Sequence, residues 1–173
     1  MLLNGYADQT TRCRIGRGCA RNEDEARGLT LPMWAEEDAG WAELHALIDS
    51  LTPEQAGRPG YFEEGWSAKD LLAHIGSWLA EAGLILERIR VGTYRPEEID
   101  VDAMNEEFRE AMADVPLDIV RAQASAARTR MLQAWQALPE MTPDAEFWLR
   151  KSGVEHYAQH LPRLREWVAE LRA

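Results

Sequence analysis

The sequence predicts an all-α protein, built as a four-helix bundle with a long connection between its second and third helices. Four long segments place apolar residues at the 3.6-residue spacing of amphipathic helices. No segment shows the sustained alternation of apolar and polar residues that a half-buried strand requires. At 173 residues, the chain is long enough for one domain with a hydrophobic core and too short for two. Four amphipathic helices in one domain bury their apolar faces most simply as a bundle.

Residues 1–32 differ from the rest of the chain, because they hold several glycines and arginines and show no sustained helical period. We expect a flexible N-terminal extension, or the translation of an upstream start codon, followed by a bundle domain over residues 33–173. Cys13 and Cys19 lie in this extension, and their spacing fits no common zinc or redox motif. They are expected to be ordinary thiols, with a two-thiol regulatory tail as the alternative.

The first helix is predicted within "MWAEEDAGWAELHALIDSL", residues 33–51, whose large apolar side chains fall near one face. The following "TPEQAGRPG" contains two prolines and two glycines, which predicts the end of this helix. A loop then leads through "YFEEG" to the second helix.

The second helix has a strong start signal. In "GWSAKDLLAHIGSW", Ser67 has the position of an N-cap and Asp70 the spacing of a capping-box partner. The apolar period continues to residue 90, and Gly92 and Pro96 then predict the stop. We therefore expect a helix over residues 67–90.

The rest of the chain completes the bundle. The connection, residues 91–115, is long and is predicted to carry a short helix at 102–112. Pro116 then opens a third long helix that continues to Leu138. The last helix is expected over residues 144–171, with a break near Ser152-Gly153.

The net charge of the chain limits the classes of molecule that it is expected to bind. A formal net charge of −11 argues against non-specific binding of nucleic acid or of an anionic membrane surface, which requires clustered Lys and Arg. No apolar stretch has the length of a membrane span, and the N-terminus lacks a signal-peptide pattern. We expect a cytoplasmic protein that acts on a small molecule.

The histidines are the strongest functional signal. His74 falls on the apolar stripe of the second helix, and His156 and His160 fall four residues apart on the stripe of the last helix. Three buried imidazoles without partners are costly, whereas a divalent metal bound by three nitrogens with one open position is typical of catalytic zinc sites. The alternative is ordinary packing, because two histidines four residues apart are common on helices. His45 is expected to be a packed or surface histidine.

Two segments also carry a family resemblance. "GWSAKDLLAHIGSW" and "EHYAQHLPRLREW" resemble, in this order, the DinB-like superfamily of four-helix bundles, over about residues 34–172. This superfamily includes thiol S-transferases and the N-terminal domain of mycothiol-dependent maleylpyruvate isomerase. The resemblance implies a divalent metal, zinc or nickel, bound by His74, His156 and His160. Relatives commonly form homodimers, which leaves a homodimer open here. The same segments resemble a branch with the colibactin self-resistance protein, in which the metal is not essential.

The resemblance implies two classes of function. In the first, the metal holds a low-molecular-weight thiol, such as mycothiol, as a thiolate for S-transfer or isomerisation on an electrophilic small molecule; a hydrolase using metal-bound water is the nearest variant. In the second, the protein sequesters or opens a reactive natural product as a binding or self-resistance protein. Because both cysteines lie in the extension, the first class needs an external thiol or water.

Four further residues are candidates for supporting roles. Glu155 and Tyr157 flank His156 and are candidate catalytic residues, with a solvated glutamate and a core tyrosine as the alternatives. Arg128 and Arg130 are candidates to bind the carboxylates of a thiol cofactor, with an ordinary surface role as the alternative.

Overall fold

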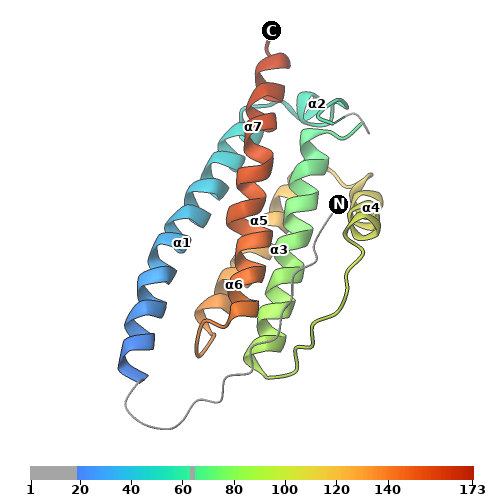
Figure 1. The fold of residues 1–173 in the computed structure, drawn as a ribbon. Helices are drawn as coiled ribbons and strands as arrows, with labels where there is room; N and C mark the ends of the chain where they lie inside the picture. The colour runs from blue at the N-terminus through green and yellow to red at the C-terminus, as the bar shows by residue number, and fades with distance from the viewer. Residues whose placement is uncertain (1–18, 63–64) are drawn as a thin grey trace.

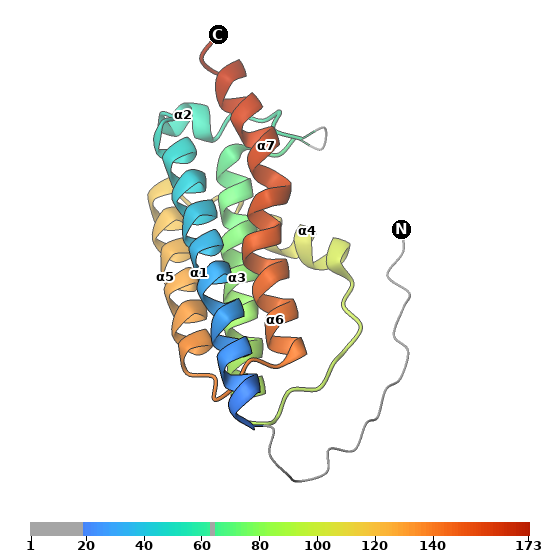
Figure 2. The same cartoon turned by 60° about the vertical axis from the view of Figure 1, so that its left-hand side comes forward.

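A computed structural model describes the backbone of residues 19–62 and 65–173 and the side chains from residue 32 onward within these ranges. Four long helices run side by side: α1 (Cys19–Asp49), α3 (Ala68–Arg90), α5 (Leu117–Gln136) and α7 (Glu155–Glu170) (Figures 1 and 2). The described residues form no strand, which confirms the predicted all-α bundle. None of the helices in this part of the chain combines the length and apolar character needed to cross a membrane.

The first helix is longer than the sequence predicted. α1 begins at Cys19 and continues through Pro32, so residues 19–32 are helical where an irregular extension was expected. This stretch contains several good helix formers, such as Ala20, Glu23 and Ala26, and their propensity outweighs the glycine on which the prediction relied. Residues 1–18, including Cys13, lie outside the described part of the chain.

The predicted start of the second helix is confirmed. Ser67 accepts a hydrogen bond from the backbone N–H of Asp70, and the Asp70 carboxylate accepts one from the backbone N–H of Ser67 at 2.9 Å. A second capping box was not predicted. Thr52 and Gln55 cap the one-turn helix α2 (Pro53–Ala56), within the segment that was expected only to end the first helix.

The last predicted helix has two α-helical parts with a wider turn between them. α6 (Pro143–Leu149) passes into the π-helical segment η1 (Arg150–Val154), which leads directly into α7. The expected break at Ser152-Gly153 therefore takes the form of a π-helical turn, a feature often found next to functional sites.

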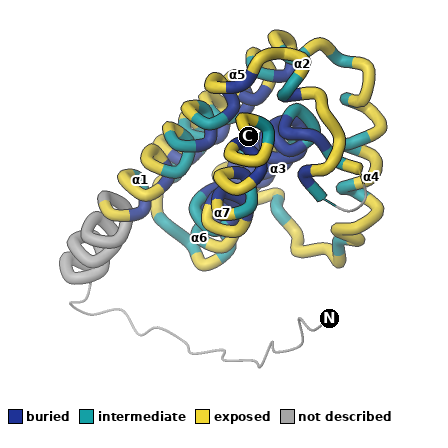
Figure 3. The backbone as a smooth tube through the Cα atoms, turned by 90° about the horizontal axis from the view of Figure 1, so that it is seen from above, coloured by how far each residue is buried: buried dark blue, intermediate teal, exposed yellow. Residues whose placement is uncertain are grey.

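The core lies between the inner faces of the helices, where the buried residues, coloured dark blue, face one another in the view from above (Figure 3). α3 and α5 pack closely, because a Cβ on Gly76 would lie 2.9 Å from the Cβ of Ala124. The connection carries α4 (Val101–Met112), which lies beside α3 outside the four-helix core (Figure 1). Trp78 Nε1 donates to Asn105 Oδ1 at 2.8 Å and so anchors α4 to the bundle.

Candidate metal centre

Three histidines from two helices meet inside the bundle. One side-chain nitrogen of each of His74, His156 and His160 lies within 4.8 Å of those of the other two. The Nε2 atoms of His74 and His156 are 2.8 Å apart. Each side chain is 6–8% exposed. The structure therefore brings together all three residues of the predicted ligand set, which we call the histidine triad.

Helical spacing explains why these three side chains converge. His74 lies on the buried stripe of α3 together with Leu71 and Trp78. His156 and His160 are four residues apart and share the buried face of α7, one turn after the other. α7 thus presents two ring nitrogens to the one that α3 presents.

Tyr61 fixes the orientation of His160. Its hydroxyl donates to the His160 carbonyl oxygen at 3.2 Å and lies 3.2 Å from His160 Nδ1. Because the single hydroxyl proton is used on the carbonyl, we assign a proton to Nδ1, which donates to the Tyr61 oxygen. Nε2 then keeps a free lone pair. Such a hydrogen bond to the outer nitrogen is the usual support of a metal-ligating histidine.

The other two imidazoles are incompletely satisfied. His74 Nδ1 and His156 Nδ1 are buried and have no hydrogen-bond partner within the described part of the chain. Each such buried polar atom costs roughly 1–3 kcal/mol. Three neutral imidazole nitrogens directed at one point are a suitable donor set for zinc, nickel, copper or iron, and the energy of metal binding would offset this cost.

The electrostatics of the site keep the imidazoles neutral. Burial, together with the neighbouring His156 and His160, lowers the pKa of His74 to about 2. Burial, with a smaller contribution from His160, lowers the pKa of His156 to about 3. Burial also lowers the pKa of His160 to about 4. At neutral pH all three rings are therefore in the uncharged form that a metal ligand needs.

The irregular loop that leads into α3 carries Phe62 and Trp66 and covers one side of the triad. The Phe62 ring lies 5.9 Å from that of His160, and the Trp66 ring lies 5.3 Å from that of His74. Gly60 has φ +122°, and a Cβ there would lie 2.7 Å from the Trp167 ring, so only glycine fits this turn. Arg163 fastens the loop to α7, with its Nε donating to the Tyr61 carbonyl oxygen at 3.0 Å.

A hollow adjoins this loop and offers room for a small molecule. Its volume is about 560 Å³. It is lined by loop residues and one α7 side chain: Pro59, Gly60, Tyr61, Phe62, Gly65 and Arg163. Because Tyr61 contacts both the hollow and His160, the hollow lies next to the support of the triad.

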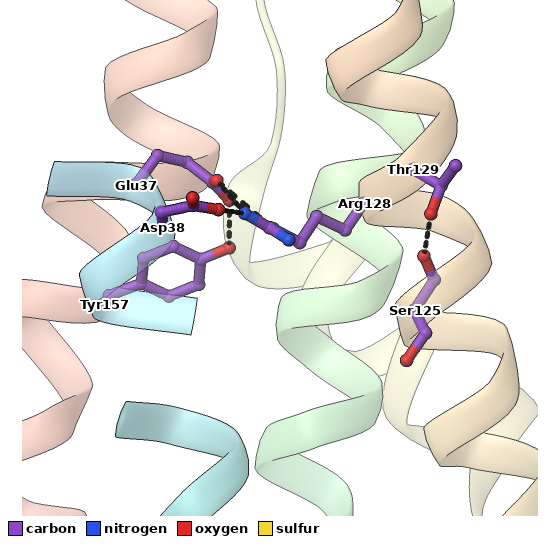
Figure 4. Close-up of polar contacts among 6 residues, drawn as sticks. All are labelled: Glu37, Asp38, Ser125, Arg128, Thr129 and Tyr157. Atoms are coloured by element: carbon purple, nitrogen blue, oxygen red, sulfur yellow. Dashed lines mark hydrogen bonds and ion pairs between the residues drawn. The ribbon is translucent and has the colours of Figure 1, made fainter. Parts of the chain in front are cut away.

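The structure places Tyr157 and Arg128 away from an open binding surface. The Tyr157 hydroxyl donates to Glu37 Oε1 at 3.0 Å, and Arg128 pairs with both Glu37 and Asp38 (Figure 4). We call these four residues the Glu37 cluster. The hydrogen-bonding groups of Arg128 and Tyr157 are thus engaged with other residues of the protein. Their shared partner on α1, Glu37, could not be predicted from the local sequence.

The remaining candidates are separate from the triad. Glu155 is 44% exposed and pairs with Lys151 at 2.6 Å, which matches the solvated alternative. Arg130 is exposed on α5 and lines a hollow of about 220 Å³ between α3 and α5. The His45 ring lies 4.1 Å from that of Trp41, centre to centre and tilted by 45°, as expected of a packed histidine.

Sequence reasoning missed the aromatic residues around the triad. Tyr61, Phe62 and Trp66 fall in an irregular segment, where no helical period indicates which side chains turn inward. The available signal was the cluster of three aromatics immediately before the capped start of α3. Large aromatic side chains in a short polar loop are expected to pack against a neighbouring site.

Comparison with known proteins identifies the family of the chain. Residues 38–171 match the family model of the mycothiol maleylpyruvate isomerase N-terminal domain. The chain belongs to this family. The match confirms the resemblance to DinB-like bundles and covers all three triad histidines. It also makes the chain a member of a mycothiol-related family, which is the coarser part of the predicted function.

A solved structure shares the fold. An uncharacterised protein from Escherichia coli UTI89 is similar with a TM-score of 0.66 and 12% sequence identity, over 80% of this chain and 91% of that one. At this identity the likeness concerns the fold alone. No curated protein matches the chain.

Proposed function

We propose that this member of the mycothiol maleylpyruvate isomerase N-terminal domain family is a divalent-metal-dependent enzyme. It would activate a low-molecular-weight thiol, mycothiol or a close relative, for S-transfer or isomerisation on an electrophilic small molecule. The observation that carries the proposal is the buried histidine triad, whose three nitrogens lie within 4.8 Å of one another. Family membership supports the choice of mycothiol as the thiol.

The chemistry begins with the thiol. A free thiol has a pKa of about 8.5 and is mostly protonated at neutral pH. A divalent metal, which His74, His156 and His160 would hold, would supply the positive charge that favours the thiolate form of the thiol. The histidines need no proton loss for this role, because their lowered pKa values keep them neutral.

The protein's own residues orient the ligands and limit solvent. Tyr61 holds His160 through its ring nitrogen and its carbonyl oxygen. Burial raises the pKa of Tyr61, so its phenol stays protonated and serves as a hydrogen-bonding group instead of a nucleophile. Phe62 and Trp66 cover His160 and His74 and restrict the access of water from this side. The hollow beside Tyr61 is the proposed place for the electrophile.

The test is a reaction of metal-loaded protein with mycothiol and two electrophiles, maleylpyruvate and a thiol-reactive bimane. The proposal predicts multiple turnovers that require both mycothiol and the metal and that disappear in His160→Ala. Turnover without any thiol would replace the proposal with a metal-dependent hydrolase. Reversible, stoichiometric binding of intact maleylpyruvate that persists in His160→Ala would replace it with a sequestering, self-resistance function; bimane uptake does not count here, because Cys13 and Cys19 react with bimane in every variant. A His45→Ala variant controls for loss of a histidine outside the triad.

A further inference from the structure

Tyr157 lies between two members of the triad in the sequence, and both its ring and its hydroxyl contact α1. Its ring packs against α1, where a Cβ on Gly40 would lie 2.5 Å from the ring carbon Cδ2. Its hydroxyl donates to Glu37 Oε1 at 3.0 Å. The residue is 1% exposed. Tyr157 therefore fixes the side of α7 that faces α1.

Glu37 is itself rigidly held. It is 1% exposed, and Arg128 reaches it from α5 with Nε 2.9 Å from Oε1 and one terminal nitrogen 2.5 Å from Oε2. The Arg128 guanidinium also lies over the Trp41 ring, 5.3 Å from its centroid. Figure 4 shows the cluster spanning three helices. A buried ion pair is weak evidence for stability, and fixing one arrangement of the chain is the best-attested use of such a pair.

The π-helical backbone before α7 explains why α7 needs these contacts to fix its orientation. The π-helical segment η1 ends at Val154, two residues before His156. A π turn interrupts the regular α-helical register, so α6 does not by itself set the rotation of α7 about its axis. Glu37 also packs on this segment, because a Cβ on Gly153 would lie 3.5 Å from Glu37 Cγ.

We propose that Glu37 is a positioning residue for the metal centre. By accepting the Tyr157 hydrogen bond while paired with Arg128, it fixes the rotation of α7 at which His156 and His160 face His74. A small rotation of α7 would move both ligands together. The inference rests on the metal-binding part of the proposed function and does not depend on the identity of the thiol or the electrophile.

The experiment measures Co²⁺ binding and the visible d–d spectrum of the Co²⁺-loaded protein, which reports ligand geometry without any activity assay. Tyr157→Phe keeps the ring on Gly40 and removes only the hydroxyl. We expect its Co²⁺ affinity to fall by about two- to tenfold, the equivalent of one hydrogen bond, with altered d–d bands. Glu37→Ala should show the same change. Glu37→Gln, which keeps an oxygen acceptor, should restore most of the affinity and the spectrum.

The matched control is Glu43→Gln. Glu43 also joins α1 to α7, through a 2.5 Å pair with Arg165, but both side chains are exposed. This variant should leave affinity and spectrum unchanged. Wild-type affinity and spectrum in Tyr157→Phe would overturn the inference even if Glu37→Ala fails to fold, and would leave the proposed function intact. Absence of Co²⁺ binding by the wild type would overturn both.

Discussion

The Glu37 cluster and the histidine triad are both buried and polar, but they differ in how their hydrogen bonds are satisfied. In the Glu37 cluster, the carboxylate, the guanidinium and the phenol all find protein partners. In the histidine triad, by contrast, His74 and His156 each keep a buried Nδ1 without a partner among the described residues. A satisfied network is what structural stability requires, whereas three neutral nitrogens that converge on one point are what a metal ion requires. The difference separates a structural clamp from a candidate site.

The largest expected effect on stability lies in the clamp. Arg128→Ala leaves the Glu37 carboxylate buried without its ion-pair partner, and we expect a loss of about 3 kcal/mol in the free energy of unfolding. Urea denaturation measures this loss. Arg165→Ala removes an exposed pair between α1 and α7 and should change the free energy of unfolding far less. Equal losses in the two variants would contradict the structural role of the Glu37 cluster.

The triad should make the metal-free protein sensitive to acid. Its histidines have a lowered pKa in the folded state, so the unfolded chain binds more protons below about pH 6.5. Stability should therefore fall as the pH drops from about 6.5 towards about 4, which is the folded pKa of His160.

Thermal unfolding of metal-free protein between pH 7.5 and 4.5 checks this expectation. His74→Leu removes the histidine with the lowest pKa and should weaken the dependence on pH. A variant whose melting temperature falls with acid as steeply as that of the wild type would show that the triad does not cause the effect.

Tyr61→Phe tests the support of the triad with a smaller change. Loss of the hydroxyl removes the bonds to His160 Nδ1 and to its carbonyl oxygen, so the affinity for Zn²⁺ should fall by about 10- to 100-fold. The free energy of unfolding should fall by only about 1 kcal/mol. Competition with a chromophoric chelator measures the affinity. Tyr94→Phe removes a hydroxyl that accepts from Trp148 Nε1, and this control should bind Zn²⁺ like the wild type.

Much of the fold follows from local sequence, because its signals are local. The Ser67–Asp70 capping box and the stop near Gly92 place α3 within one residue of the prediction. The three triad histidines could also be predicted, since each falls on a periodic apolar stripe of a helix. Residues 19–32 were the exception, because glycine was given more weight than the helix formers around it.

The residues around the site were harder to predict from the sequence, because their positions depend on contacts between residues that are distant in the sequence. Tyr61 reaches His160 across 99 positions, and its loop has no periodicity to indicate its direction. Arg128 and Tyr157 were assigned to cofactor binding and catalysis because Glu37, 91 and 120 positions away from them, was not recognised as their partner. A charged side chain on a helix does not reveal from sequence alone whether it faces a ligand or a buried countercharge.

The most direct measurement is the metal content of protein purified without an affinity tag, beside His156→Ala and His160→Ala and with His45→Ala as the control. We predict about one divalent ion per chain in the wild type and in the control, and none in either triad variant. No metal in the wild type, even after reconstitution with zinc or nickel, would contradict it. So would an ion that remains bound in both triad variants.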